Sequence, residues 1–236
     1  MLQQTIKNML SRTSLGKAKP YKKSYSQCGE DLIIDFIFGQ IGVTRPSYID
    51  IGAHHPYYLS NTALFSEKGS KGINIEPDPY LFSQFIKARP HDTNLNVGAG
   101  QQDGYQDFYI MSTPTMNTFS KTVADELVET AGFSIKEVKP IQLLSLNTVL
   151  DKYNASKFPD LFSLDVEGLD EVIIQSIDFR KSYPKVICVE TLSYSDNGQG
   201  KKNNQLIELI SNKGYAQYAD TYINTIFVKE GLLRRI

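Results

Sequence analysis

The chain has 236 residues, of which 41% are hydrophobic and 22% charged, a composition typical of one soluble α/β domain with a sizeable core. Its net charge of −1 gives no reason to expect a nucleic-acid partner, and no apolar run approaches the roughly 20 residues of a membrane span. Cys28 and Cys188 are too few and too far apart for a disulfide framework or a zinc motif, so a cytoplasmic location is expected.

The first 24 residues differ from the rest of the chain. They hold six basic residues and no acid, and the spacing of Leu2, Ile6 and Met9 favours a narrow apolar stripe on a short helix. A packing or mobile arm is one interpretation. The other is a peripheral contact with an anionic membrane surface or an acidic partner. Residues 25–236 are expected to form the main domain.

The main domain is expected to begin with a helix, in which Glu30 and Asp31 place acids in the first turn, where they suit the helix dipole. Residues 48–51 (YIDI) then form a short apolar run typical of a buried parallel strand. Asp50 lies near the carboxyl end of this run, and Gly52 opens the next turn. Because ligands of open α/β sheets bind just beyond the carboxyl ends of strands, the stretch predicts a small-molecule site. An ordinary strand-to-loop turn is the alternative.

Helices and strands alternate through most of the remaining chain. Helices expected at 61–69 and up to residue 87, with strands at 73–75 and 93–97, predict a doubly wound parallel sheet. Residues 104–146 are less regular, with strands expected at 106–110 and 138–146 and a helix at 123–131; such an insertion often forms a substrate wall. The later elements are expected as strands at 161–165 and 185–190, helices at 169–177 and 205–213, and a closing antiparallel hairpin of 215–218 with 223–228.

Four expected strands carry an acid at or near the carboxyl end: Asp50, Glu76, Asp165 and Glu190. In a doubly wound sheet these ends share one edge, and clustered carboxylates are costly without a positive charge. Glu76 follows Asp50 by 26 positions, near the spacing of about 20 at which an acid takes ribose hydroxyls. The three spaced glycines of a dinucleotide site and the P-loop are both missing. A nucleoside with a positive group, such as S-adenosyl-L-methionine, fits these constraints.

The chain also resembles the FkbM-type S-adenosylmethionine-dependent methyltransferases. Five ordered motifs carry the resemblance: residues 26–31 (SQCGED), 50–53 (DIGA), 60–62 (SNT), 72–79 (GINIEPDP) and 164–168 (LDVEG). The resemblance runs from about residue 25 to 229, and it departs from the family at Ser70-Lys71, where an aromatic residue is common. It implies the Rossmann-like α/β fold of class I methyltransferases. That fold has a seven-stranded, mostly parallel sheet with an antiparallel last strand and helices on both faces. The family activity it implies is O-methylation, often of a sugar or polyketide hydroxyl.

Seven residues are expected to bind the cofactor. We expect Asp50 and Gly52 to line the methionine part of the cofactor and Glu76 to hold the ribose hydroxyls. Asn96 or Val97, at the end of the third expected strand, would flank the adenine. By the family motifs, three further residues would close over the amino-acid end of the cofactor: Gln27, Ser60 and Asn61.

Asp165 and Glu190 end the strands that follow the insertion, where the acceptor is expected. Asp165 or a nearby histidine such as His54 would act as the general base toward an acceptor hydroxyl. Alternatively, Mg²⁺ or Mn²⁺ held by Asp165 and Glu190 would lower the pKa of that hydroxyl and orient it.

The leading interpretation is therefore an O-methyltransferase that acts on a carbohydrate or glycoconjugate. The same fold acting on a lipid, a peptide or a small natural product is one alternative, and a non-catalytic member that only binds the cofactor is another. The oligomeric state stays open.

Overall fold

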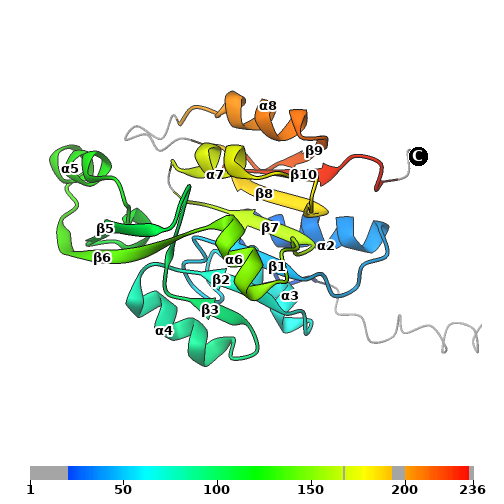
Figure 1. Ribbon diagram of the computed structural model, residues 1–236, viewed down its shortest axis with the longest axis horizontal. Helices are drawn as coiled ribbons and strands as arrows, with labels where there is room; N and C mark the ends of the chain where they lie inside the picture. The colour runs from blue at the N-terminus through cyan, green and yellow to red at the C-terminus, as the bar shows by residue number, and fades with distance from the viewer. Residues whose placement is uncertain (1–20, 167, 193–199, 234–236) are drawn as a thin grey trace, which may run out of the picture.

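The structure is a computed structural model, and it describes residues 21–166, 168–192 and 200–233. A seven-stranded sheet forms its centre (Figure 1). In spatial order the strands are β3 (Thr93–Leu95), β2 (Gly72–Ile75), β1 (Tyr48–Ile51), β7 (Leu161–Leu164), β8 (Val186–Glu190), β10 (Asn224–Lys229) and β9 (Tyr215–Asp220). The first five are parallel, whereas β10 is antiparallel to both of its neighbours. The mostly parallel sheet with an antiparallel last strand is thus confirmed.

Helices cover both faces of this sheet because the central strands are apolar on both sides, as is usual for parallel strands. Tyr48 packs on one face with α2 (Glu30–Gln40) and α3 (Ala63–Glu67). Ile49 and Ile51 pack on the other face, which is covered by α6 (Leu146–Tyr153), α7 (Asp170–Ser176) and α8 (Asn204–Asn212). The alternation of side chains along β1 therefore separates two apolar cores.

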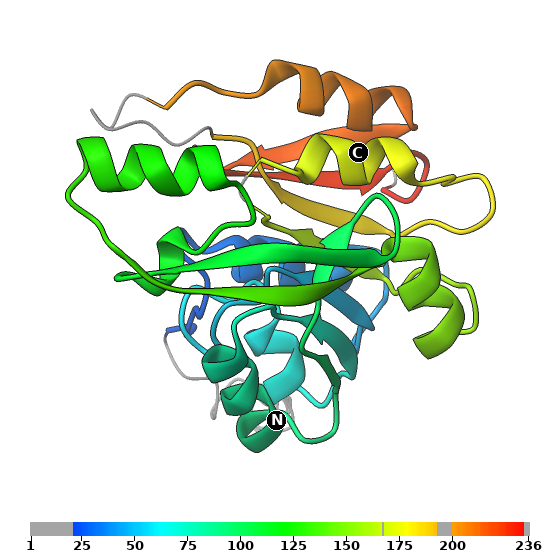
Figure 2. The same cartoon turned by 60° about the vertical axis from the view of Figure 1, so that its left-hand side comes forward.

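A second sheet stands beside the main one (Figure 2). Its three strands, in the order β4-β6-β5, are β4 (Gly98–Gly100), β6 (Ile135–Ser145) and β5 (Gly104–Met111). The 3-10 helix η2 (Pro114–Met116) and helix α5 (Lys121–Thr130) connect β5 to β6. The less regular segment 104–146 thus forms β5, β6 and the connection between them. The third strand of the small sheet, β4, comes before this segment, and Leu146 already belongs to α6.

Side-chain caps mark where several helices begin. Asp78 precedes α4 (Pro79–Ala88), and its carboxylate accepts hydrogen bonds from two backbone amides of the first turn. Ser120 and Ser145 cap α5 and α6 in the same way, each accepting from the backbone amide three residues on. Such caps satisfy amides that have no partner inside the helix.

Two expected strands are confirmed with changed limits. The strand expected at 138–146 is β6, Ile135–Ser145. Its last residue caps α6, a helix that was not predicted. The strand expected at 93–97 ends at Leu95, and residues 98–100 pair with β6 instead of continuing along β2.

The basic segment 1–24 lies outside the described residues except for its last four. Among the helices that the structure does describe, none has the length and hydropathy of a membrane span.

Candidate active site

A cavity of about 540 Å³ opens at the carboxyl ends of β1, β2, β7 and β8. Three of the four acids singled out in the sequence line it: Glu76, Asp165 and Glu190. Gly52, His54 and Gln27 line it as well, whereas the small sheet and its connection contribute Phe108 and residues 114–119. The volume lies within the range of about 300–1,000 Å³ that is usual for small-molecule sites.

Gly52 makes the turn at the end of β1 possible. It has a φ of 73°, and its amide and that of Ala53 both donate to the carbonyl of Ile75, at 3.1 Å each. A Cβ atom on Gly52 would lie 1.8 Å from the carbonyl oxygen of Asp165. Only glycine therefore lets the ends of β1 and β7 approach this closely.

Glu76 is a buried carboxylate, 5% exposed, at the edge of the cavity. One oxygen accepts from the backbone amide of His54 at 2.7 Å, and the other accepts from the amide of Asp78 at 2.8 Å. Burial raises the pKa of Glu76 to about 8. In the ionised form each oxygen keeps a lone pair, so the side chain is held in place and can still accept a hydrogen bond from a ligand hydroxyl.

Asn96 does not lie on the cavity, contrary to the expected contact with adenine. Its side-chain amide donates to the carbonyls of Glu76 and Pro77, at 2.9 Å each, and so braces the turn that carries Glu76. Asn117 is on the cavity instead. Its amide group donates to Asp78 and accepts from the backbone amide of Met111, which links the small sheet to the turn after β2.

Asp50 is the one acid of the four that turns away from the cavity. Its neighbours Ile49 and Ile51 face the core under α6 and α7, so alternation along the strand points Asp50 to the opposite face. There it is 4% exposed and accepts a hydrogen bond from Thr62 Oγ1 at 2.6 Å. Burial raises the pKa of Asp50, and the nearby Arg89 opposes that rise.

Arg89 is a buried cation that the sequence reading missed. It is 2% exposed and follows α4. Its guanidinium donates to Thr62 Oγ1 at 2.8 Å, to Ser60 Oγ at 2.9 Å and to the carbonyl of Pro56. Arg89 therefore stabilises the loop of residues 53–61 through hydrogen bonds and supplies a positive charge near Asp50.

Ser60 and Asn61 support this loop and do not line the cavity. Ser60 is buried on Arg89, and the amide of Asn61 donates to Ser163 Oγ at 3.3 Å. The loop presents His54 and Leu59 to the cavity, although both have positive φ, 53° and 55°. Non-glycine residues in this conformation need support from their surroundings, and strain of this kind often accompanies a functional site.

His54 is the histidine on the cavity. Burial, followed by the proximity of His55, lowers its pKa below 6.5. It is therefore neutral near pH 7 and can accept a proton. Since β1 and β7 are adjacent, His54 and Asp165 come from neighbouring strand ends.

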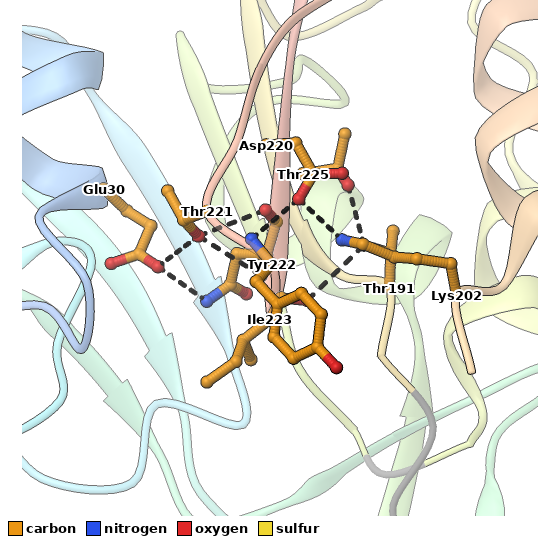
Figure 3. Close-up of polar contacts among 9 residues, drawn as sticks. Glu30, Thr191, Lys202, Asp220, Thr221, Tyr222, Ile223 and Thr225 are labelled. Atoms are coloured by element: carbon orange, nitrogen blue, oxygen red, sulfur yellow. Dashed lines mark hydrogen bonds and ion pairs between the residues drawn. The ribbon is translucent and has the colours of Figure 1, made fainter. Parts of the chain in front are cut away.

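Ile223 lines the cavity, and a cluster of hydrogen-bonded side chains lies on each side of it (Figure 3). On one side, Glu30 accepts from Thr221 Oγ1 at 2.7 Å and from Asn224 Nδ2 at 3.1 Å. Burial alone would raise the pKa of Glu30, but these hydrogen bonds and that from the Cys28 amide lower it.

On the other side of Ile223, the ammonium of Lys202 donates to Thr191 and Asp220 (Figure 3). Thr191 Oγ1 also lies 2.7 Å from Thr225 Oγ1. Helix α2 and the end of β8 are thereby tied to the β9–β10 turn beside the cavity.

For a metal ion, two expected ligands, Asp165 and Glu190, do share the cavity. Within the described part of the chain, however, no group of three or more His, Cys, Asp or Glu side chains is placed to hold an ion. The residues described thus do not form a complete metal site.

Comparison with known proteins gave one family and several structural neighbours. The family model of the methyltransferase FkbM domain matches residues 50–216. No curated protein matches the sequence.

Solved structures with a similar arrangement share little sequence with this chain. A TehB-like SAM-dependent methyltransferase from Corynebacterium glutamicum has 10% identity and a TM-score of 0.44, covering 96% of this chain and 97% of that one. An O-methyltransferase from Bacillus cereus in complex with SAH has 11% identity and a TM-score of 0.39, with coverage of 96% and 91%. Similarity at this level says nothing about the substrate.

Proposed function

The chain belongs to the FkbM methyltransferase family and is an S-adenosylmethionine-dependent methyltransferase, and we propose that it methylates a hydroxyl group of a carbohydrate or glycoconjugate. The observation that carries this proposal is the cavity, in which a buried acid lies at the end of β2 and two further acids lie across β1 at the ends of β7 and β8. The first acid suits a ribose, and the other two suit an acceptor that must lose a proton.

The residues present fit the cofactor. Glu76, with both oxygens anchored by backbone amides, would accept hydrogen bonds from the ribose hydroxyls. Gly52 and Gln27 would lie along the methionine end, since both line the cavity and Gly52 follows β1 directly. Asn117, tied to the turn after Glu76, would flank the adenine in place of Asn96.

Bound S-adenosylmethionine supplies an electrophilic methyl group, whose bond to sulfur breaks as its bond to the acceptor oxygen forms, leaving S-adenosylhomocysteine. The acceptor hydroxyl gives its proton to Asp165 or His54, the two cavity residues that the sequence named as bases. A neutral imidazole has one unprotonated ring nitrogen, through which His54 would accept this proton. Positioning of the two reactants can contribute about 7–11 kcal/mol. Loop 53–61, which Arg89 holds and which brings His54 to the cavity, would contribute to that positioning.

Assistance by Mg²⁺ or Mn²⁺ stays a prediction, and no step above depends on it. Asp165 and Glu190 offer two carboxylates, and a metal would need further ligands. Methyl transfer measured before and after chelation with EDTA, and again after Mg²⁺ or Mn²⁺ is restored, tests this prediction directly.

The proposed function is tested in two steps. Calorimetry with S-adenosylhomocysteine should show one binding site, and the absence of binding would refute the proposal. Tritiated S-adenosylmethionine is then supplied with pooled polysaccharides, with lipids or with peptides. Alkali-stable label on the polysaccharides is expected; label confined to lipids or peptides would refute the carbohydrate assignment and favour the corresponding alternative acceptor.

A further inference from the structure

A second cavity, of about 640 Å³, adjoins the first. One wall comes from β5 and the stretch that follows η2, and the other comes from the turn between β7 and α7. The two cavities share four wall residues: Thr118, Phe119, Val166 and Leu169. They are therefore neighbouring compartments on the same side of the molecule, separated by these side chains.

The shared wall begins next to the proposed site of reaction. Asp165 lines the first cavity, and Val166, the next residue, lines both. An acceptor whose reacting hydroxyl lies near Asp165 would thus contact Val166 with its remaining atoms. From there the second cavity is the adjacent open hollow.

Aromatic rings in the second cavity are fixed in position. Phe119 packs against Phe108 with ring centroids 4.7 Å apart. A Cβ atom on Gly98 would lie 2.4 Å from the Phe119 ring, so glycine at this position allows the ring to sit where it does. Tyr109 adds a second ring, and its backbone pairs with Thr118 in both directions, at 2.8 and 3.2 Å.

Polar groups of both kinds lie beside these rings. The amide of Gln106 donates to the carbonyl of Phe119 at 3.0 Å, which leaves its oxygen as an acceptor. Asp107 adds a carboxylate and Lys121 an ammonium group. Flat apolar faces next to donors and acceptors match a sugar ring, which has an apolar face and a rim of hydroxyls. An acyl chain would instead cover these polar groups without pairing them, which is costly.

We propose that the second cavity binds the part of a saccharide acceptor that lies beyond the methylated ring, so that the acceptor contains two or more sugar rings. This inference rests on the proposed function, because the reacting hydroxyl is placed at Asp165. It adds a subsite and a minimum length to the acceptor.

The test uses the full chain saturated with S-adenosylhomocysteine, fluorescently labelled and applied to a glycan microarray. The variant Gln106→Ala/Asp107→Ala changes two exposed side chains of the second cavity. The control Gln142→Ala changes an exposed residue of the partner strand that does not line either cavity. Affinity for S-adenosylhomocysteine is measured for all three proteins.

We expect the wild type and the control to bind glycans of two or more rings better than the matching monosaccharides. The double variant should bind them tenfold or more weakly while its affinity for S-adenosylhomocysteine is unchanged. Binding of monosaccharides alone, of no glycan, or of glycans equally well by the double variant would overturn the inference. A wild type that does not bind S-adenosylhomocysteine would instead refute the proposed function, whatever the array shows.

Discussion

Replacing Glu76 by Gln should separate the cost of a buried carboxyl group from its use in binding. The pKa of Glu76 is raised by burial from 4.5 to about 8. Between these values the folded protein keeps a proton that the unfolded chain has lost. Stability must therefore fall as the pH rises through this window, and the loss is complete above about pH 8.

The size of this loss follows from the two pKa values. One pKa unit corresponds to about 1.4 kcal/mol, so Glu76 lowers the free energy of unfolding by about 4 kcal/mol between pH 5 and pH 8. Gln does not titrate, and Glu76→Gln should lack this decline. The amide of His54 or of Asp78 also loses its acceptor, which costs about 1–3 kcal/mol at every pH. The slope with pH, rather than the absolute stability, is thus the quantity to compare.

The dependence of the free energy of unfolding on pH is measured by urea unfolding between pH 5 and pH 8. Unfolding is monitored by circular dichroism, because the chain has no tryptophan. Glu67→Gln, at an exposed position of α3, makes the same chemical change away from the cavity and should behave as the wild type. In calorimetry at about pH 9, above the pKa of Glu76, Glu76→Gln should bind S-adenosylhomocysteine about 10- to 100-fold more weakly, because the ionised acceptor of the ribose hydroxyls is lost. Parallel stability curves for the wild type and Glu76→Gln would refute the burial argument, and equal affinities would remove Glu76 from the ribose site.

Three further predictions concern the loop, the turn and the base. Arg89→Met should lower the free energy of unfolding by about 3–5 kcal/mol, because it removes the buried cation near Asp50 and the donors to loop 53–61. Urea unfolding at pH 7 measures this loss, and an unchanged midpoint would contradict the prediction. Gly52→Ala should abolish binding of S-adenosylhomocysteine in calorimetry, since its Cβ would lie 1.8 Å from a carbonyl oxygen, and wild-type affinity would show that the turn is not part of the site. Methyl transfer should fall at acidic pH as the base becomes protonated. If His54 is the base, this decline starts below pH 6.5 and disappears in His54→Ala but not in Asp165→Asn; the reverse outcome assigns the base to Asp165.

Much of the fold could be predicted because its signals are local. The strands β1, β2, β7 and β8 are short, mostly apolar runs bounded by turn formers, and an acid or glycine at or just after the last residue of each run marks its carboxyl end. Parallel strands bring these ends to one edge, so Gly52, Glu76, Asp165 and Glu190 could be placed on one cavity before any coordinates were known.

Asp50 shows how a correct element can carry a wrong assignment of its side chain. Its strand was predicted with the right limits, and the acid was assigned to the ligand because it lies near the strand end. A strand directs successive side chains to opposite faces, and Asp50 alternates with Ile49 and Ile51. The structure therefore buries it on the face of α3, where it accepts a hydrogen bond from Thr62.

The amino-acid sequence by itself determined the order of the strands in the main sheet, their common edge and the family, but not helix α6 or strand β4. Only the tertiary structure decided which polar groups reach that edge and which support it. Arg89 meets Thr62 across 27 positions, and Asn117 meets Asp78 across 39. Contacts over such separations exist only once the sheets and loops have packed, because nothing in the neighbouring residues of either partner specifies them.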